Sequence, residues 1–433
     1  MSPAPTRPRA RHGARAAHRR VLVGIMSGVA AVTGFAVVYG ATNALLLQNS
    51  FETHDVTSLL ASGDDDTVAA AAGPEDFAAG EDLNIVLIGT DERNGENAEI
   101  GGDVASGMRG DTTMVMHISA DRSRIDVVSI PRDSRVRISD CKMYDGSTVT
   151  GWTGKFNIAL ANGGKNGDRG EGAACVMQTI QDLTGVDLGG HFVMVDFSGF
   201  EDMVDAIGGV PMCITQDMSS KKAKLDLTAG AQVLDGETAL AFARARTGSG
   251  LGGDGTDLAR IERQQELLTN TARKVLGLNY LTDVADLTQF VRAGAESLTM
   301  DSDLGSLNNI IGLAYSLRSF DTDNLNFYTV PWQYAGDGSG DVVWSEPAAT
   351  EMWEAIVNDE PIESAEENVE DATPEPSSSA EPSADASATE EPDAIATASA
   401  TATPDATEPT PSVSPSPLRE TEDEILAGCV IDE

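Results

Sequence analysis

Short apolar runs alternate with amphipathic segments over residues 82–358 of this 433-residue chain. Runs rich in β-branched and other apolar side chains predict strands at 83–89, 113–118, 124–130, 192–197 and 326–330. Apolar residues recur three and four positions apart at 173–183, 200–207, 236–245 and 258–275, which predicts helices there. Strands that alternate with helices in this way are typical of layered folds. We therefore expect one α/β domain over residues 82–358, with three α/β/α layers around a central mixed sheet.

The first 47 residues have the pattern of a membrane-insertion signal. Residues 21–47 contain no charged side chain, and this run exceeds both the roughly 20 residues that span a bilayer as helix and the apolar core of a cleavable signal peptide. Residues 1–20 contain no acid and six arginines, Arg7, Arg9, Arg11, Arg15, Arg19 and Arg20. Because arginines stay on the cytoplasmic side, we expect a cytoplasmic N-terminus, one transmembrane helix at 21–47 and an extracellular remainder. Cleavage near Thr42 to Ala44 is the alternative.

Two further segments lack the periodicity of a packed domain. Residues 48–81 are rich in Ala, Gly and Asp, which predicts an extracellular spacer. Residues 359–433 hold 21 acids and one base, Arg419, so they carry −20 of the formal net charge of −40. This Pro, Ser, Thr and Glu-rich composition cannot bury a core, and we expect a disordered acidic tail that serves as a stalk or solvated linker.

The charge of the whole chain excludes one broad class of function. Lys and Arg number 29 against 69 Asp and Glu, which gives the net charge of −40. A surface this acidic repels the phosphates of nucleic acids, so a general DNA or RNA binder is excluded.

Four cysteines, Cys141, Cys175, Cys213 and Cys429, lie in the segment expected outside the membrane. An even number of cysteines in an oxidising compartment predicts disulfides, and their spacing excludes the pairs of a zinc ribbon. Three pairings are open. We favour Cys141 with Cys175 and Cys213 with Cys429, because the second bond ties the C-terminus to the fold.

Acidic residues follow the first predicted strand and precede the second. Asp91 lies in GTDER, and Asp111 lies in MRGDTT after a glycine-rich insertion. Ligands gather at strand ends in α/β sheets, and one or two carboxylates together with phosphate oxygens are the usual ligands of Mg²⁺. The two aspartates are therefore candidate ligands of one divalent cation, and turn capping by Asp is the alternative explanation.

Arginines concentrate near the same loops. Arg132 follows the third strand, Arg244 and Arg246 end a predicted helix, and Arg260 and Gln264 share one face of the next helix. Guanidinium groups bind phosphate in a bidentate manner and keep their charge, so this set predicts an anion site. A salt bridge from Arg132 to Asp133 and a helix-dipole role for Arg244 and Arg246 are the alternatives.

Seven ordered motifs over residues 83–275 resemble one family. They are IVLIGTDER, MRGDTTMV, VVSIPRD, GKFNIALANGG, FVMVDFSGFEDMVDAIGGV, LDGETALAFARAR and DLARIERQQ. In this order and spacing the chain is similar to the LytR-CpsA-Psr family of cell-envelope enzymes, in its actinobacterial type.

The resemblance implies a membrane-anchored phosphotransferase. Such an enzyme moves a glycopolymer phosphate from a polyprenyl-pyrophosphate carrier to peptidoglycan or a surface glycoprotein and releases polyprenyl phosphate. By this resemblance Asp91 and Asp111 hold Mg²⁺ or Mn²⁺ and act with Arg132 in catalysis. The residues implied to bind the pyrophosphate are Arg132, Arg244, Arg246, Arg260 and Gln264. Phosphoryl transfer depends mainly on positioning and charge neutralisation, which fits this set.

Other motif residues have weaker implications. Lys155 and Asn157 in GKFNIALANGG are expected to shape the site, and Asp103 in the glycine-rich insertion can replace either aspartate as a metal ligand. A polyprenyl chain needs an apolar slot, although ordinary core packing is the favoured explanation for each individual candidate wall residue. The candidate walls are Phe192, Val195, Phe197, Phe200, Met203 and Ile207.

Two other functions remain compatible with the motifs. A polyprenyl-pyrophosphate hydrolase uses the same site with water as acceptor, and an envelope regulator binds the carrier without turnover. The number of matched charges favours an enzyme over a regulator. The transferred glycan, the acceptor and any general base stay undetermined by the sequence.

Overall fold

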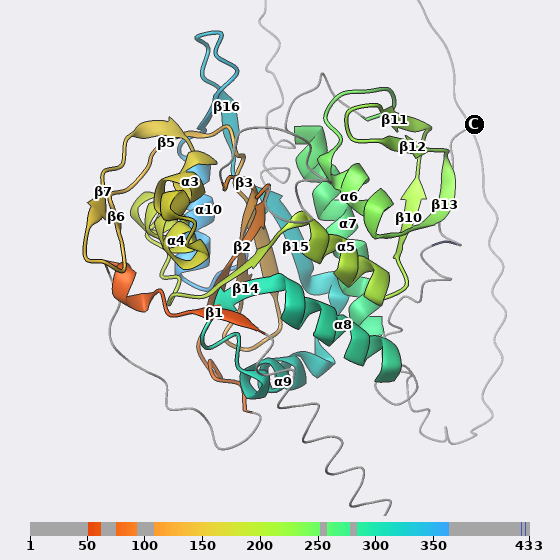
Figure 1. Cartoon of the computed structure of the whole chain (residues 1–433), viewed down its shortest axis with the longest axis horizontal. Helices are drawn as coiled ribbons and strands as arrows, with labels where there is room; N and C mark the ends of the chain where they lie inside the picture. Colours follow the sequence, from red (N-terminus) through yellow and green to blue (C-terminus); the bar gives the residue numbers. More distant parts are fainter. Residues whose placement is uncertain are drawn as a thin grey trace, which may run out of the picture. The chain divides into compact units, whose positions relative to one another are not determined.

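A central mixed sheet organises the computed structural model, which describes residues 51–61, 75–92, 108–251, 258–277 and 284–362 together with Leu426 and Cys429. The sheet has seven strands (Figure 1). In spatial order they are β1 (Glu52–His54), β14 (Leu298–Asp301), β9 (Phe192–Val195), β2 (Leu83–Thr90), β3 (Gly110–Ile118), β4 (Ile125–Ser129) and β15 (Leu325–Thr329).

The strand directions bring several chain segments to one edge of this sheet. β2 runs parallel to β9 and antiparallel to β3, β3 is antiparallel to β4, and β4 is parallel to β15. β14 is antiparallel to β9, and β1 is parallel to β14. The ends of β2, β9, β4 and β15 and the beginnings of β3, β14 and β1 therefore lie at a single edge, which we call the β2 carboxyl edge.

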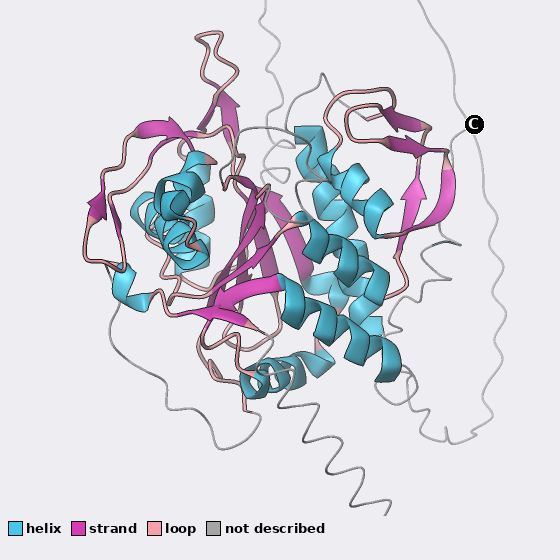
Figure 2. Cartoon of the chain, viewed as in Figure 1, coloured by secondary structure: helices cyan, strands magenta, loops and turns pink. Residues whose placement is uncertain are grey.

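Helices cover both faces of the sheet (Figures 1 and 2). One layer contains α3 (Ile158–Gly163), α4 (Arg169–Thr184) and α10 (Ala348–Val357), and the other contains α5 (Phe197–Ala206), α6 (Gly236–Arg244), α7 (Leu258–Gly277) and α8 (Val284–Ser297). α9 (Leu307–Ser316) lies beyond the opposite edge. The expected three layers and mixed sheet are confirmed.

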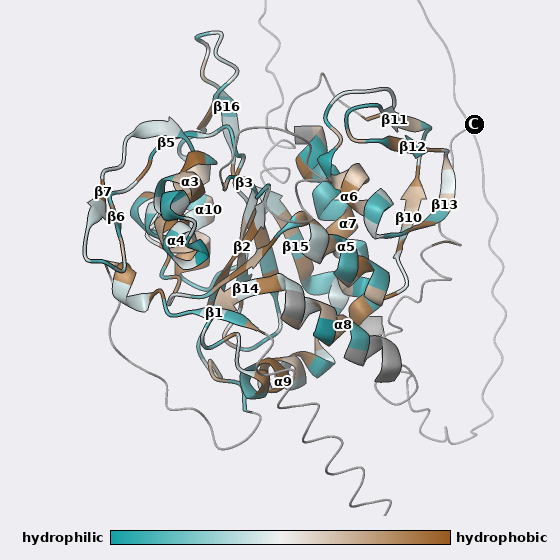
Figure 3. Ribbon diagram, viewed as in Figure 1, coloured by the Kyte–Doolittle hydropathy of each residue, from teal (hydrophilic) through white to brown (hydrophobic). Residues whose placement is uncertain are grey.

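Alternation of side chains along β2 produces the two cores. Val86 and Ile88 pack in the cluster that contains Met177 of α4, whereas Leu83 and Ile85 pack in the cluster that contacts Leu268 of α7. Successive side chains of a strand point to opposite faces, so a continuous apolar run is buried on both sides. Figure 3 shows the hydrophobic positions gathered on the central strands.

Small two-stranded sheets extend the two helical layers. Beside α6 and α7, β10 (Val210–Ile214) pairs with β13 (Gly230–Leu234) and β11 (Met218–Ser220) pairs with β12 (Leu225–Leu227). On the other side of the molecule the pairs are β5 (Arg135–Arg137) with β8 (Thr153–Lys155), β6 (Cys141–Lys142) with β7 (Thr148–Val149), and β16 (Trp332–Tyr334) with β17 (Val342–Trp344). Short 3₁₀ helices occur at Thr57–Leu59, Gly164–Asn166, Leu317–Ser319 and Thr322–Asn324.

Every predicted strand and helix exists, with boundaries moved by capping residues. The predicted strand 192–197 stops at Val195 because the Asp196 side chain accepts a hydrogen bond from Gly199 N and starts α5. The predicted helix 173–183 begins earlier, where the Asp168 side chain accepts from Glu171 N. The predicted strand includes the capping residue Asp196, whereas Asp168 belongs to no predicted element.

The domain is larger at both ends than the sequence predicts. Instead of a spacer, residues 52–54 form the edge strand β1, and Val56, Leu59 and Leu60 are buried in the core. Instead of joining the tail, Asp359 accepts hydrogen bonds from Arg124 and Ala120 N and lies 3.0 Å from His117 Nε2. These contacts correct the expected boundaries at residues 82 and 358.

The predicted transmembrane helix at 21–47 and the tail from residue 363 to 425 lie outside the described residues. Within the described part of the chain, no helix is both long and apolar enough to cross a bilayer.

Both favoured disulfides are present. Cys141 of β6 is bonded to Cys175 of α4, and Cys213 of β10 is bonded to Cys429. The second bond joins residues 216 positions apart and fixes Cys429 to β10.

Reduction should lower the free energy of unfolding, by about 2–4 kcal/mol for each bond, because the reduced unfolded chain is less restricted. Urea unfolding with and without a reductant measures the change. The double variant Cys213→Ala/Cys429→Ala isolates the second bond, and a midpoint equal to that of the parent protein would show that it contributes nothing.

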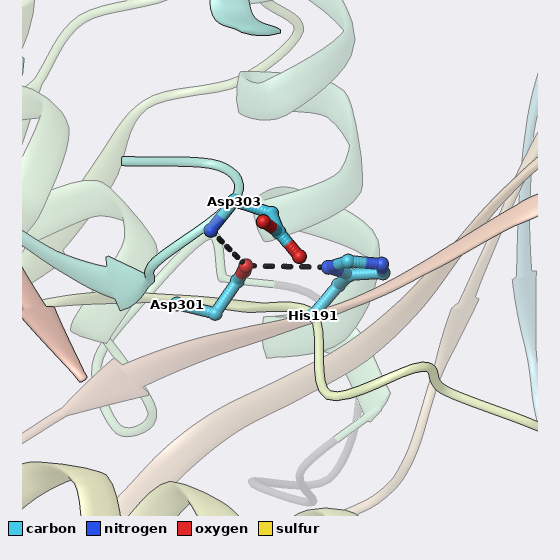
Figure 4. A group of neighbouring side chains, drawn as sticks. All are labelled: His191, Asp301 and Asp303. Carbon is cyan, nitrogen blue, oxygen red and sulfur yellow. Dashed lines mark hydrogen bonds and ion pairs between the residues drawn. The ribbon is translucent and has the colours of Figure 1, made fainter. Parts of the chain in front are cut away.

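A buried polar group joins β9 to β14 at the edge opposite the β2 carboxyl edge. His191 Nδ1 lies 3.2 Å from Asp301 Oδ1, and Asp303 faces the same ring (Figure 4). Asp301 also accepts hydrogen bonds from the backbone N–H groups of Phe192, Asp303 and Leu304. A carboxylate already bound by three N–H donors holds the strand ends together, so we interpret the group as structural.

This group should make stability depend on pH. Burial lowers the pKa of His191, but the hydrogen bond to Asp301 and the charges of Asp301 and Asp303 outweigh it, and the pKa is raised above 6.5. The stabilisation is therefore fully present below about pH 6.5 and is lost as pH rises through the folded-state pKa. Melting temperatures between pH 6 and 9 should fall for the parent and show less decline for His191→Gln. Equal slopes would contradict the assignment.

Candidate active site at the β2 carboxyl edge

A cavity of about 500 Å³ opens between the β2 carboxyl edge and helices α5, α6 and α7. Its walls are mainly apolar, and its polar lining is concentrated in a few side chains. The large apolar residues that line it are Leu87, Ile88, Met114, Val193, Val195, Phe197, Phe200, Met203, Leu240, Leu267, Leu268 and Leu298. The charged and amide side chains are Asp111, Asp196, Arg132, Arg244, Arg246, Arg260 and Gln264. A ligand that fits such a cavity has an apolar body and an anionic group.

Arg132 and Asp111 form a close ion pair in this cavity. Arg132 Nη1 donates to Asp111 Oδ1 at 2.5 Å, and Arg132 Nε lies 3.6 Å from Asp133 Oδ2. The backbone carbonyl of Arg132 accepts from Asn157 N at 3.1 Å, which fixes the turn after β4. The salt bridge offered as the simple explanation for Arg132 therefore exists, and Arg132 nevertheless lines the cavity.

Helix α7 supplies two buried polar side chains from one face. Arg260 and Gln264 have exposed fractions of 4% and 8%. Arg260 Nη2 donates to the carbonyl of Asp111 at 3.0 Å, and Gln264 Nε2 donates to the carbonyl of Ala243 at 3.0 Å. These carbonyl acceptors hold both side chains in place.

The end of α6 supplies the remaining arginines. The guanidinium of Arg244 lies over the ring of Phe197, 4.1 Å from its centre, and Arg246 Nη2 lies 3.8 Å from Asp133 Oδ2. The face of an aromatic ring attracts a cation, so Phe197 helps to orient the guanidinium of Arg244. The structure thus gathers all four arginines and Gln264, as the motifs predict.

The metal-ligand candidates lie at the same corner of the sheet. Asp91 N donates to the carbonyl of Arg109 at 3.1 Å, so Asp91 lies across the β2–β3 pair from the residues that precede Asp111. Asp111 lines the cavity and Asp91 follows the lining residue Thr90. Two carboxylates provide the hard oxygen donors that Mg²⁺ and Mn²⁺ prefer, so the donor set fits such an ion. Asp103 lies outside the described residues.

Lys155 acts on the site through Asp133. Lys155 Nζ donates to Asp133 Oδ1 at 2.6 Å and lies 3.3 Å from Asp341 Oδ1. The hydrogen bond to Asp133 raises the pKa of Lys155 against the effect of burial. Lys155 is therefore protonated at neutral pH and holds Asp133, which in turn contacts Arg132 and Arg246. The expected role of Lys155 in shaping the site stays a prediction.

Four of the six residues expected to form the walls of a lipid-binding slot line the cavity. Val195, Phe197, Phe200 and Met203 line the cavity. Phe192 instead packs against α4 on the other face of the sheet, and Ile207 packs in the core beneath α6 and α7. For those two residues the core-packing explanation is correct.

Two further polar residues of this region were not singled out from the sequence. Asp196 lines the cavity, and its place between a strand and a helix in VMVDFSGF was an available signal. Arg263, 6% exposed, donates to the carbonyls of Leu251 and Ala245, and burial together with the charge of Arg260 lowers its pKa. Arg263 thereby fixes the end of α6 to α7.

Comparison with known proteins places the chain in a family. Residues 47–358 match the model of the LytR_cpsA_psr family. The chain belongs to this family. The LytR-CpsA-Psr assignment covers the whole sheet, including β1 and β14, which the sequence motifs did not reach.

Curated relatives come from actinobacteria and firmicutes. The probable cell wall biosynthesis protein LcpB of Corynebacterium glutamicum is 35% identical over 193 residues, 43% of this chain and 40% of the relative. LcpA of the same organism is 30% identical over 242 residues, 53% of this chain and 44% of the relative. A polyisoprenyl-teichoic acid–peptidoglycan teichoic acid transferase, TagU of Enterococcus faecalis, is 26% identical over 53% of this chain and 65% of its own length. The chain thus spans less than half of the two Corynebacterium relatives.

A solved structure supports the fold alone. The LytR-Csp2A-Psr enzyme from Actinomyces oris superposes with a TM-score of 0.50 at 17% identity, over 71% of this chain and 96% of that chain.

The two settings of arginine at this edge predict losses of stability of different size. Arg263→Ala should lower the free energy of unfolding by about 1.5–3 kcal/mol, because two buried carbonyls lose a charged donor. Arg132→Ala should cost less than about 1 kcal/mol, because it breaks a partly solvated ion pair. Urea unfolding of both variants beside the parent measures the contrast, and equal losses would contradict it.

Proposed function

We propose that the protein is a membrane-anchored phosphotransferase of the cell envelope. In this proposal it transfers a glycopolymer phosphate from a polyprenyl-pyrophosphate carrier to a peptidoglycan hydroxyl or a surface glycoprotein and releases polyprenyl phosphate. One observation carries the proposal: an apolar cavity of about 500 Å³ has four arginines and a glutamine among its lining residues. A polyprenyl pyrophosphate has the matching chemistry, an apolar chain with a strongly anionic head.

The names of relatives support this reading. TagU proteins of Enterococcus faecalis and Bacillus cereus are called polyisoprenyl-teichoic acid–peptidoglycan teichoic acid transferases, and LcpA is called a cell wall biosynthesis protein. The apolar run at 21–47 and the arginines before it support a single anchor with a cytoplasmic N-terminus and an extracellular domain.

In the proposed reaction the arginines bind the pyrophosphate. Arg132, Arg246 and Arg260 surround the corner at Asp111, and Arg244 approaches from the Phe197 side. Guanidinium groups fixed before the substrate arrives stabilise the charge that spreads over the phosphoryl oxygens in the transition state. Gln264 is positioned by Ala243 to contact the same head group.

Asp91 and Asp111 are the proposed ligands of Mg²⁺ or Mn²⁺. When bound, such an ion neutralises phosphate charge and polarises the reacting phosphorus. Asp111 Oδ1 is engaged by Arg132, which orients the carboxylate.

The direct test incubates the full chain in detergent micelles with Mg²⁺, a polyprenyl-pyrophosphate glycan and peptidoglycan fragments. Mass spectrometry should detect the glycan joined to the acceptor through one phosphate. Release of glycan phosphate without any acceptor would make the protein a hydrolase, and binding without product would make it a regulator. The protein should begin before residue 51, because β1 belongs to the sheet.

Removing one of the arginines proposed to bind the pyrophosphate should greatly lower the rate of transfer. We expect Arg132→Ala and Arg260→Ala to lower the turnover number by roughly 100-fold or more, the usual effect of losing one preorganised donor. Arg137→Ala, which removes a solvent-exposed arginine with 59% side-chain exposure, is the matched control. A turnover number equal to that of Arg137→Ala would show that the substituted arginine does not bind the pyrophosphate.

Filling the cavity should discriminate between carriers of different chain length. Val195→Trp adds bulk to a cavity wall, so we expect KM to rise about tenfold or more for a long polyprenyl carrier and to change little for a short soluble one, since each displaced CH₂ is worth about 0.8 kcal/mol. Val233→Trp, at a surface position 42% exposed, is the control. An equal effect on both carriers would place the lipid elsewhere.

A further inference from the structure

A single arginine of the opposite helical layer reaches the β2 carboxyl edge. Arg169 is the first residue of α4, and its side chain is 19% exposed. Its Nε donates to Glu92 Oε2 at 2.8 Å, its Nη2 donates to Asp196 Oδ2 at 3.0 Å, and its Nη1 donates to Thr299 Oγ1 at 3.0 Å. Glu52 Oε2 lies 3.4 Å from Nη1. One guanidinium therefore joins the ends of β2 and β9 with the beginnings of β14 and β1.

The partners of Arg169 lead directly to the candidate site. Glu92 follows Asp91, so the bond to Glu92 fixes the segment that carries a proposed metal ligand. Asp196 lines the cavity, and its other oxygen, Oδ1, accepts from Gly199 N and caps α5. The next residue, Phe197, supports Arg244.

We propose that Arg169 is a positioning residue for the reaction. It holds the segment that contains Asp91 and the start of α5 together across the end of the sheet. It therefore fixes the position of the proposed metal ligand Asp91 relative to Arg244. This inference rests on the proposed function.

The charge balance explains why this position needs arginine. Glu92 and Asp196 have side-chain exposures of only 12% and 11%, and Glu52 adds a third carboxylate. Burial lowers the pKa of Arg169, but the charges of Glu92, Asp196 and Glu52 outweigh it and raise that pKa. Without the cation, Glu92 and Asp196 repel each other at short range and separate the two segments.

Geometry excludes lysine as an equivalent. The planar guanidinium directs separate N–H groups to Glu92, Asp196 and Thr299, whereas an ammonium is a single point charge on a flexible stem. Arg169→Lys therefore keeps the charge and loses the simultaneous contacts. This separates the effect of charge from the effect of positioning.

The test compares the parent with Arg169→Lys, Arg169→Met and Arg169→Met/Asp196→Asn, all as full chains in detergent micelles. Mn²⁺ binding is followed by electron paramagnetic resonance in the presence of farnesyl pyrophosphate, and transfer is followed as a function of Mg²⁺ concentration. Arg137→Met, at an exposed ion pair of 3.6 Å, is the matched control. Melting temperatures verify that each variant is folded.

We expect Arg169→Met to weaken Mn²⁺ binding at least fivefold and to raise the Mg²⁺ concentration for half-maximal transfer by a similar factor. Arg169→Lys should show a smaller shift in the same direction. The double variant should recover part of the Mn²⁺ affinity, because removing the charge of Asp196 removes its repulsion with Glu92.

Three outcomes would overturn the inference. Metal binding equal to that of Arg137→Met is the first, full activity of Arg169→Lys at every Mg²⁺ concentration is the second, and no recovery in a folded double variant is the third. If Arg169→Met fails to fold, the Arg169→Lys comparison decides alone. A parent that binds Mn²⁺ and farnesyl pyrophosphate but transfers nothing would reject the proposed function, while the binding series would still decide the role of Arg169.

Discussion

The antiparallel ladder between β2 and β3 is the constraint on which the site depends. It pairs Thr90 with Gly110, after a shift in register at Gly89, and so places Asp91 and Asp111 at one corner. The pairing of β3 with β4 has a similar effect. Ile130 N donates to the carbonyl of Thr113, and the turn that follows directs Arg132 to Asp111. Backbone hydrogen bonds therefore determine where the charges meet.

The helical layer converts this corner into an amphipathic cavity. α5, α6 and α7 contribute apolar walls, and the arginines and the glutamine that this layer adds to the lining come from the end of α6, the residues just after it and the first two turns of α7. In a chain with a net charge of −40, buried arginines are stable only if neighbouring groups orient them. The carbonyls that hold Arg260 and Arg263, and the ring beneath Arg244, orient these side chains.

The sequence predicts what depends on local pattern and ordered motifs. The strands β2, β3, β4, β9 and β15, the helices α4 to α7 and the arginines that line the cavity were expected from the sequence, because each belongs to a repeated spacing or an ordered motif. The helices α3, α8, α9 and α10 were not predicted. β1 and β14 were missed because strands of three and four residues with polar members show no usable alternation. The tail boundary was missed because one carboxylate, Asp359, meets His117 through a contact that composition cannot reveal. Arg169 was missed for a similar reason: an isolated charge has no pattern, and only the folded sheet assembles its partners.

The position of β1 connects the proposed anchor to the site. Glu52 begins β1, and the strand directions put it at the β2 carboxyl edge, where Arg169 binds it together with Glu92. The apolar run ends at residue 47, and the five-residue step to Glu52 spans at most about 18 Å. A chain anchored by that run therefore meets the domain at the edge that contains the cavity. Under the proposed anchoring, a carrier whose lipid lies in the same bilayer has a short path to the arginines.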